Sequence, residues 1–312
     1  MGKINTVLNE IDSSQLGFTL MHEHCYLGSW NHRHAFKDWF DYQAGLDMIV
    51  GVLKDAKAHG VDSIVDVTTL NMGRDIHLLQ DASKLSGINI IAAGGYMYDE
   101  HDRLSSEGIV DAILSEVYNG IEDTDIKPGV LKTGTSEFGF TKSNLKILNA
   151  VAEAAQKCGL PIITHCRPAN TRQGLFQLDI FEQHNVDLSK VVIGHYRNGD
   201  SLAYGREVMN RGANLAIDQM NFNDHQLAHN LEVIPQLVKE GYADRLILSH
   251  DAVIVYNYEK WNRWDHKQYI NYSENSLSHI SRNIIPALKE RGVSDKDIHQ
   301  MMYDNPQRIL SR

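Results

Sequence analysis

Residues 18–24 read Phe-Thr-Leu-Met-His-Glu-His, a short apolar run that closes with two histidines one residue apart. On a β-strand, His22 and His24 point their side chains to the same face, and Glu23 points to the opposite one. If the shared face lines the inside of a barrel, the two imidazoles converge on one point, as metal ligands do. A histidine pair alone more often consists of ordinary surface or core residues, so the rest of the chain decides. Glu23 is expected to bond to the barrel wall or to a neighbouring strand.

This run is the first of eight short, nearly continuous apolar runs, the pattern of parallel strands that are covered on both faces. Helical patterns separate the runs, and the clearest spans residues 144–157, where Leu148, Val151 and Ala155 share a face. Eight strand–helix units in a chain of this length predict an α/β fold, a (β/α)₈ TIM barrel. The expected strands are residues 18–24, 63–68, 88–94, 129–134, 161–166, 191–195, 214–218 and 245–251.

The chain has 312 residues without a low-complexity tract or linker, so we expect a single domain over residues 1–312. Residues 1–16 form a short segment before the first barrel strand. A net charge of −10 without a basic stretch argues against nucleic-acid binding. No apolar run reaches the roughly 18 residues of a membrane span, and no secretory signal is recognisable. Three widely spaced cysteines suit a reducing compartment, so we expect a cytoplasmic protein that acts on a small molecule.

Ionisable residues fall at or near the ends of five of the expected strands, where the active sites of α/β barrels lie. They are His22, His24, Lys132, His165, His195 and Asp251. Taken alone, His165 could be a hydrogen-bonded core histidine and Asp251 could cap a helix. Lys132 is harder to explain in this way, because an unpaired ammonium inside a barrel is costly and needs a partner or a covalent change. Together the six residues predict a functional site at one end of the barrel.

The motifs around these residues resemble those of the phosphotriesterase family of the amidohydrolase superfamily, including its phosphotriesterase-like lactonases. The likeness extends from about Gly17 to Leu310, nearly the whole chain. Residues 19–24 (Thr-Leu-Met-His-Glu-His) are similar to the motif of the family's first strand. The other matching segments are residues 64–69 (Ile-Val-Asp-Val-Thr-Thr), 73–75 (Gly-Arg-Asp), 193–195 (Ile-Gly-His), 248–251 (Leu-Ser-His-Asp) and 305–308 (Asn-Pro-Gln-Arg).

The resemblance implies a binuclear metal centre. His22, His24 and Asp251 would bind the more buried metal, and His165 and His195 the more exposed one. Imidazole and carboxylate ligands suit zinc first, with manganese, cobalt or iron as alternatives.

Lys132 has a special role in this scheme. Carboxylated by carbon dioxide, it would bridge the two metals together with a hydroxide, and the carbamate would remove the problem of a buried ammonium. Two divalent ions lower the pKa of a water between them and polarise the bond that is attacked. Asp251 would then accept a proton and pass it to the leaving group. Lys132 and Asp251 are therefore the expected catalytic residues.

Two long segments rich in aromatic residues follow the first and last expected strands, residues 26–41 and 252–275. These strands are neighbours in a closed barrel, so we expect the two segments to meet over the metals as a lid and an apolar pocket wall. Packing of one segment on the other, or a dimer interface, would explain the same residues. The aromatic residues are Trp30, Phe36, Trp39, Phe40, Tyr256, Tyr258, Trp261, Trp264, Tyr269 and Tyr272.

Other expected substrate-binding residues depart from the family pattern. The large aromatic residue of the phosphotriesterase pocket would fall at Met97, between Tyr96 and Tyr98. Gln219 stands where the lactonase branch carries an arginine and phosphotriesterases a histidine. These departures put acyl-homoserine lactones and organophosphates in doubt as native substrates. Arg167 is predicted to bind an anionic or phosphorylated group, although a structural salt bridge is equally consistent with it.

These observations predict a binuclear metal-dependent hydrolase whose bridging hydroxide attacks a lactone, a carboxylic ester or a related ester. The substrate would carry an anionic or phosphorylated group, and phosphotriester hydrolysis would be a side activity. One alternative is an amidohydrolase for a small N-acylated metabolite. Another is a non-catalytic ligand-binding barrel, although such a protein would not need Lys132 and Asp251 together. By analogy with relatives, we expect a homodimer.

Overall fold

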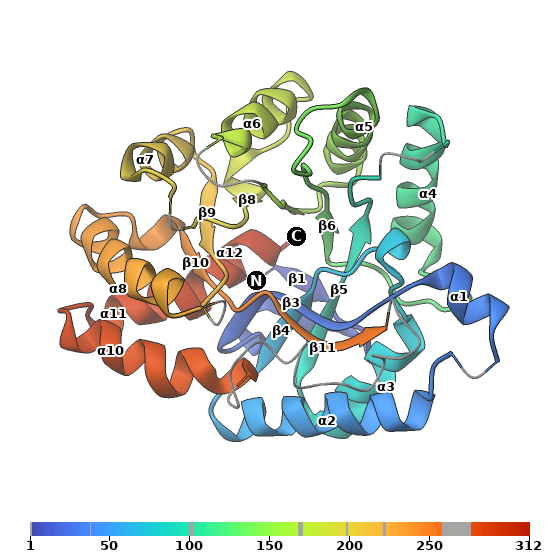
Figure 1. Ribbon diagram of the computed structural model, residues 1–312, viewed down its shortest axis with the longest axis horizontal. Coiled ribbons are helices and arrows are strands. Elements are labelled where there is room, and N and C mark those ends of the chain that lie inside the picture. Colours follow the sequence, from blue (N-terminus) through green and yellow to red (C-terminus); the bar gives the residue numbers. More distant parts are fainter. Residues whose placement is uncertain are drawn as a thin grey trace.

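The computed structural model describes residues 2–37, 39–99, 103–167, 171–197, 199–220, 223–257 and 276–312. Parallel strands form a central ring, and helices surround it (Figure 1). Each of the eight predicted apolar runs overlaps one of these strands, which confirms the predicted TIM barrel. The barrel strands are β3 (Thr19–Gly28), β4 (Ser63–Asp66), β5 (Asn89–Gly95), β6 (Val130–Lys132), β7 (Ile162–Ile163), β8 (Val191–Ile193), β9 (Asn214–Ile217) and β10 (Leu246–Leu248).

Helices follow most of the strands and cover their outer face. The helices are α1 (Trp30–Ala35), α2 (Tyr42–Ala58), α3 (Ile76–Ser86), α4 (Ser106–Asn119), α5 (Lys142–Cys158), α6 (Gln173–Gln183), α7 (Leu202–Asn210), α8 (Asp224–Lys239), α10 (Ile285–Glu290), α11 (Asp295–His299) and α12 (Asn305–Leu310). Helix α5 contains the residues predicted to be helical. The Thr141 side chain accepts a hydrogen bond from the amide of Asn144 at its start, and Gly159 ends it with a φ of 71°.

The last barrel strand is interrupted and then continues. After β10 the chain breaks its pairing at residues 249–251, and β11 (Ala252–Asn257) then pairs in parallel with the far half of β3. The ring closes at this break, where the Asp251 amide donates to the His22 carbonyl oxygen at 3.0 Å. The aromatic segment predicted to follow the last strand therefore begins with a further strand at residues 252–257, because β3 extends beyond β4 and offers an edge. Residues 258–275, with five of the predicted aromatic residues, lie outside the described residues.

The apolar residues divide into two layers. One cluster lies between the strands and the surrounding helices, and a smaller one fills the inside of the barrel with residues such as Met21, Val65 and Ile247. The buried Ile4 and Ile11 of the antiparallel hairpin β1 (Lys3–Asn5) and β2 (Glu10–Asp12) belong to the inner cluster. The segment before the first barrel strand therefore closes the amino-terminal end of the barrel, together with α12.

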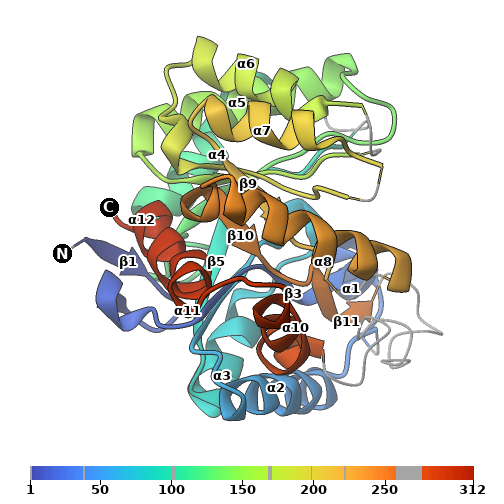
Figure 2. The same ribbon diagram turned by 90° about the vertical axis from the view of Figure 1, so that its left-hand side faces the viewer.

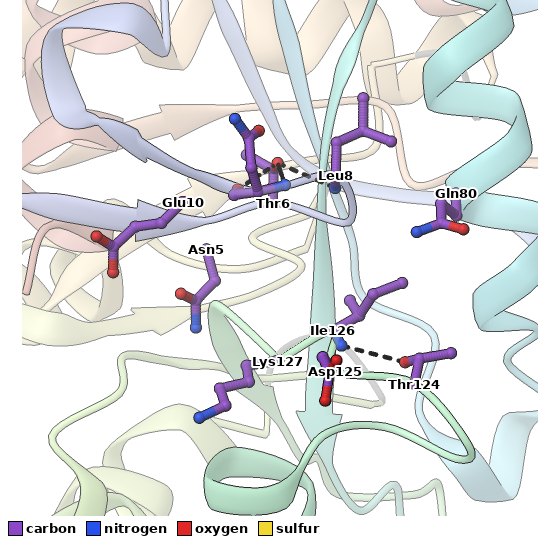
Figure 3. Close-up of a pocket in the computed structure, with 10 residues that line it drawn as sticks. Asn5, Thr6, Leu8, Glu10, Gln80, Thr124, Asp125, Ile126 and Lys127 are labelled. Atoms are coloured by element: carbon purple, nitrogen blue, oxygen red, sulfur yellow. Dashed lines mark hydrogen bonds between the residues drawn. The ribbon is translucent and has the colours of Figure 1, made fainter.

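The two ends of the barrel differ in what covers them. In Figure 2, β1 and α12 lie at one end, and α1 and β11 lie at the other. A cavity of about 400 Å³ lies at the first end, between the hairpin and the segment before β6 (Figure 3). None of the predicted site residues lines this cavity. Among the described residues, no helix has both the length and the apolar character that a membrane crossing requires.

Candidate metal centre

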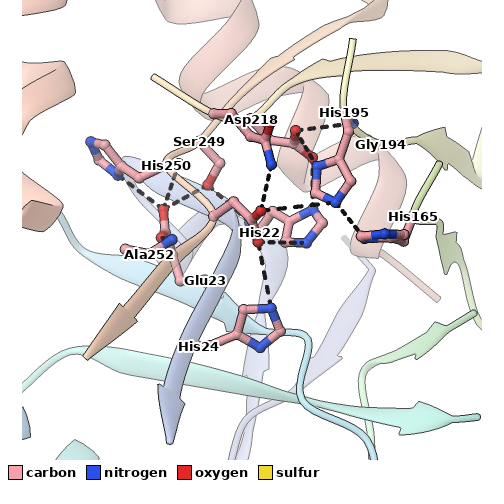
Figure 4. Close-up of polar contacts among 12 residues, drawn as sticks. His22, Glu23, His24, His165, Gly194, His195, Asp218, Ser249, His250 and Ala252 are labelled. Atoms are coloured by element: carbon pink, nitrogen blue, oxygen red, sulfur yellow. Dashed lines mark hydrogen bonds and ion pairs between the residues drawn. The ribbon is translucent and has the colours of Figure 1, made fainter. Parts of the chain in front are cut away.

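His22 and His24 lie in one cluster at the carboxyl end of the barrel (Figure 4), and Asp251 joins them. His22 and His24 extend from β3 to the inside of the ring, as strand alternation predicts. Their Nε2 atoms lie 3.4 and 3.5 Å from Oδ1 of Asp251, which stands at the break between β10 and β11. One ligand atom from each of these three residues lies within 4.8 Å of the others, a spacing that suits a metal ion. The Asp251 side chain is 18% exposed, so it faces both the cluster and its opening.

The other predicted ligands adjoin this trio. The Lys132 ammonium lies at the end of β6, 3.0 Å from His22 Nε2, and donates to the Thr164 carbonyl oxygen at 3.3 Å. His195 Nε2 lies 2.6 Å from His165 Nδ1 and 3.9 Å from Asp251 Oδ2. The structure therefore brings all six predicted metal-site residues together, five of them almost fully buried.

Asp218 is a member of the cluster that the sequence analysis missed. It follows β9 and is fully buried. One carboxylate oxygen lies 2.7 Å from His22 Nδ1, and the other lies 2.9 Å from His195 Nδ1 and accepts the His195 amide at 3.0 Å. Asp218 thus holds the outer nitrogens of both imidazoles and turns their Nε2 atoms to the centre. Asp218 ends the expected strand at residues 214–218, and this position alone could have marked it as a candidate site residue.

Glu23 lies behind the cluster and faces away from it, as predicted. Its carboxylate accepts hydrogen bonds from the Ser249 hydroxyl at 2.8 Å and from the amides of His250 and Ala252 at 3.0 and 2.9 Å. The His250 ring nitrogen Nδ1 also lies 2.9 Å away. These partners flank Asp251, whose φ of 56° is in the left-handed region that side chains rarely adopt. Glu23 therefore fixes the backbone on both sides of a strained candidate ligand.

Burial shifts the ionisation of the cluster. Burial and the charge of Lys132 lower the pKa of His22 to about 4, and burial and His195 lower the pKa of His165 well below its usual range. Burial also lowers the pKa of Lys132 to about 8. At Asp218 burial acts in the opposite direction, but His195 and His22 outweigh it and keep the pKa below the usual range. The site thus combines neutral imidazoles with ionised carboxylates, the forms that bind metal ions.

The predicted substrate-binding residues fall into two groups. Gln219 donates to Asp251 Oδ2 at 2.9 Å, and the ring of Tyr98 lies 5.6 Å from that of His165. Arg167 follows His165 and is close enough for its charge to act on that histidine. Tyr96 and Met97 instead pack inward. Tyr96 lies against the main hydrophobic cluster, and Met97 is 7% exposed with its backbone bonded to the Asn71 side chain.

The predicted contact between the two aromatic segments is confirmed for their described parts. The Trp39 indole donates to the Asn257 carbonyl oxygen at 3.1 Å, and the Asn257 amide donates to the Trp39 carbonyl oxygen at 3.4 Å. The segment after β3 is not a plain loop, because Ser29 caps the short helix α1. Trp39 is 4% exposed and Phe36 is 45% exposed, so the aromatic residues of this segment do not share one role.

Comparisons with known proteins extend over nearly the whole chain. The sequence profile of the Phosphotriesterase family matches residues 2–310. The solved structure of the phosphotriesterase from Mycobacterium tuberculosis superposes with a TM-score of 0.87 at 33% identity, covering 99% of this chain and 98% of that one.

Two curated relatives have names that state different reactions. An aryldialkylphosphatase from Saccharolobus solfataricus is 30% identical over 97% of this chain and 98% of its own length. An N-acetyltaurine hydrolase from Xenopus tropicalis is 28% identical over 99% of this chain and 98% of its own length. Both names describe hydrolases, one acting on phosphorus esters and the other on an amide.

Proposed function

The chain belongs to the phosphotriesterase family, and on that basis we propose that it is a binuclear metal-dependent hydrolase of small carbonyl substrates. The observation that carries this proposal is the single cluster formed by His22, His24, Asp251, His195 and Lys132 at the carboxyl end of the barrel. The bond cleaved is that of a lactone, a carboxylic ester or a related ester, and phosphotriester hydrolysis is a side activity.

The donor atoms of the cluster fit two metal ions. Nδ1 of His165 and Nε2 of His195 face each other in the cluster and lie 2.6 Å apart. One ion could bind both nitrogens, because neutral imidazole nitrogens are good metal ligands. The outer nitrogens of His22 and His195 are held by Asp218, as is usual for imidazoles that bind metal through the other nitrogen. His22, His24 and Asp251 would hold one ion, and His165 and His195 the other.

Lys132 fits the role of a bridge between the two ions. A buried ammonium next to the His22 imidazole would repel both ions. The lowered pKa of Lys132, about 8 because of burial, makes the neutral amine accessible near neutral pH. A neutral amine can add carbon dioxide to give a carbamate, which supplies two anionic oxygens at the same place. When bound, the two ions lower the pKa of a water molecule and polarise the substrate carbonyl.

Asp251 is the residue to accept the proton of that water and return it to the leaving group. It is the ligand whose side chain is partly open to the outside of the cluster. Gln219 donates to its Oδ2 and so holds the carboxylate in one orientation. The role proposed for Gln219 is therefore to position Asp251 at the edge of the substrate pocket.

A second candidate reaction is the hydrolysis of a small N-acylated metabolite with an anionic group. Two observations favour it. Arg167 stands beside the cluster with a cationic side chain, and the matched N-acetyltaurine hydrolase is named for an N-acyl substrate that carries a sulfonate. An amide and an ester pass through similar tetrahedral states, so the same cluster serves either reaction.

The test is a hydrolysis screen with zinc- or manganese-loaded protein against lactones, carboxylic esters, N-acyl amides and phosphotriesters, each with and without an anionic group. Metal content is measured on the same sample. About two equivalents of metal with turnover that is lost on chelation supports the proposal. A folded protein that binds no metal and cleaves none of these compounds would instead be a ligand-binding barrel.

A further inference from the structure

Two arginines occupy equivalent positions on neighbouring strands. Arg167 stands two residues after His165, beyond β7, and Arg197 stands two residues after His195, beyond β8. Strands β7 and β8 pair in parallel, so both arginines leave the barrel at the same edge. The guanidinium of Arg197 donates to the carbonyl oxygen of Cys166 at 3.3 Å, which brings it to the backbone next to Arg167.

Both guanidinium groups have unsatisfied donors. The Nε atoms of Arg167 and Arg197 are buried and lack a hydrogen-bond partner in the part of the chain that the structure describes. The negative charges that act on the Arg197 side chain include those of Asp218 and Asp251, which already belong to the metal cluster. Asp200 binds the Arg197 backbone amide at 3.0 Å rather than its side chain.

Such an arrangement is costly without a ligand. Two cations that leave neighbouring strands at the same edge repel each other, and burial strengthens this repulsion. Buried N–H groups without acceptors add a further cost. An oxyanion between the two groups would accept from both Nε atoms and would neutralise the repulsion.

We infer that Arg167 and Arg197 form a two-guanidinium clamp for the anionic end of the substrate, and that this end is a tetrahedral oxyanion, a sulfonate or a phosphonate. A tetrahedral oxyanion offers three oxygens to two guanidinium groups that approach it from neighbouring strands, whereas a carboxylate offers only two in one plane. The clamp lies just beyond His165 and His195 along the chain. We therefore expect only a short chain of atoms in the substrate between its anionic group and the carbonyl carbon that is attacked. This inference rests on the proposed function for the reacting end of the substrate.

A matched series of N-acetylated amines tests the clamp with the metal-loaded protein. The compounds carry a two-carbon spacer that ends in a sulfonate, a phosphonate, a carboxylate or a neutral hydroxyl. We expect kcat/KM to be highest for one of the two tetrahedral anions, and the series shows which. Replacing one arginine (Arg197→Met or Arg167→Met) should raise KM for that substrate by about 10- to 100-fold, the effect of a lost charge-assisted hydrogen bond, with a smaller effect on kcat.

Two further variants separate recognition from folding. Arg197→Lys keeps the charge but not the planar fork, and it should recover part of the affinity that Arg197→Met loses. Arg291→Met removes an exposed arginine at the end of α10 and should leave all kinetic values unchanged. An equal loss of activity on anionic and neutral substrates in the Arg197→Met protein would assign Arg197 a structural role and overturn the inference.

Binding of a small anion tests the clamp independently of hydrolysis. Calorimetric titration with ethanesulfonate, ethylphosphonate and propionate should show tighter binding of a tetrahedral anion, and this binding should be lost in the Arg167→Met/Arg197→Met double variant. If binding is seen without any hydrolysis, the clamp stands and the proposed function fails. If amides or esters are cleaved while no anion binds, or propionate binds as well as the others, the clamp fails and the proposed function stands.

Discussion

Lys132 is in an electrostatic conflict with the proposed metal centre, because its buried nitrogen faces a histidine that would bind metal. A carbamate on Lys132 would resolve the conflict, because it replaces the positive ammonium at the end of the side chain with a negative group. This exchange has a consequence that can be measured without any substrate.

The Lys132→Glu variant should keep most of its bound metal, because glutamate supplies two oxygens near the place of the carbamate. The Lys132→Met variant has a similar volume but no charge, and it should retain less than half of the metal. Metal content by mass spectrometry after gel filtration compares the two. Equal metal retention in both variants would show that residue 132 is not a bridge.

Glu23 acts on the cluster from behind, through the backbone around Asp251. The Glu23 carboxylate accepts hydrogen bonds from the amides of His250 and Ala252. In Glu23→Gln the side-chain NH₂ group would face at least one of these donors, and that hydrogen bond would be lost. We expect a loss of about 1.5–3 kcal/mol in the free energy of unfolding. Metal affinity should fall by about 10- to 100-fold, as for other groups that orient metal ligands.

Urea unfolding and metal competition titrations measure these two effects of Glu23→Gln. Glu232→Gln, on the exposed face of α8, is the control and should change neither. A normal metal affinity in Glu23→Gln would mean that Asp251 keeps its left-handed backbone without this support.

At the scale of elements, the hairpin β1–β2 closes the amino-terminal end of the barrel. Ile4 is 1% exposed and belongs to the cluster that fills the ring. Ile4→Ala should therefore cost about 2–4 kcal/mol of unfolding free energy, by lost burial and by the cavity that remains.

Denaturant unfolding compares this variant with Leu8→Ala, in the loop of the same hairpin. Leu8 is 44% exposed, so its truncation should cost less than about 0.5 kcal/mol. Similar losses in both variants would contradict the role of Ile4 as part of the inner core.

The elements also show what sequence can and cannot predict. The eight barrel strands are recognisable because strands covered on both faces need continuous apolar runs. The three-residue strands of the hairpin are too short to give such a signal. Residues 252–256 do form an apolar run, but they directly follow the last expected strand, and they form β11 because β3 is long enough to pair with them. For the site, the ligand residues carry a motif, whereas Asp218 does not. A single carboxylate after a strand is not recognisable as part of a site from the sequence. The role of Asp218 is visible only in the structure, where it lies between two histidines from other strands.

At the scale of the whole molecule, metal ions would tie together strands that are far apart in the chain. The proposed ligands come from β3, β6 and the segments after β7, β8 and β10. Removal of the metal by a chelator should thus lower the melting temperature as well as abolish hydrolysis, because a ligand that binds only the folded state stabilises it.

Calorimetry before and after chelation checks the effect, and zinc or manganese should restore both properties. The stabilisation is about 4 kcal/mol when free metal exceeds its Kd by 1,000-fold. A melting temperature that does not respond to chelation or to added metal would argue against a bound ion at this place.

The break between β10 and β11 also limits how this protein could be redesigned. Most loops at the mouth of a barrel accept insertions and deletions. Residues 249–251 would not, because one added residue before Ala252 would reverse the two faces of β11 against β3 and withdraw the Ala252 amide from Glu23. A library that varies segment length, or a graft from a relative, should therefore transfer residues 249–257 as one block and begin its variation after Asn257.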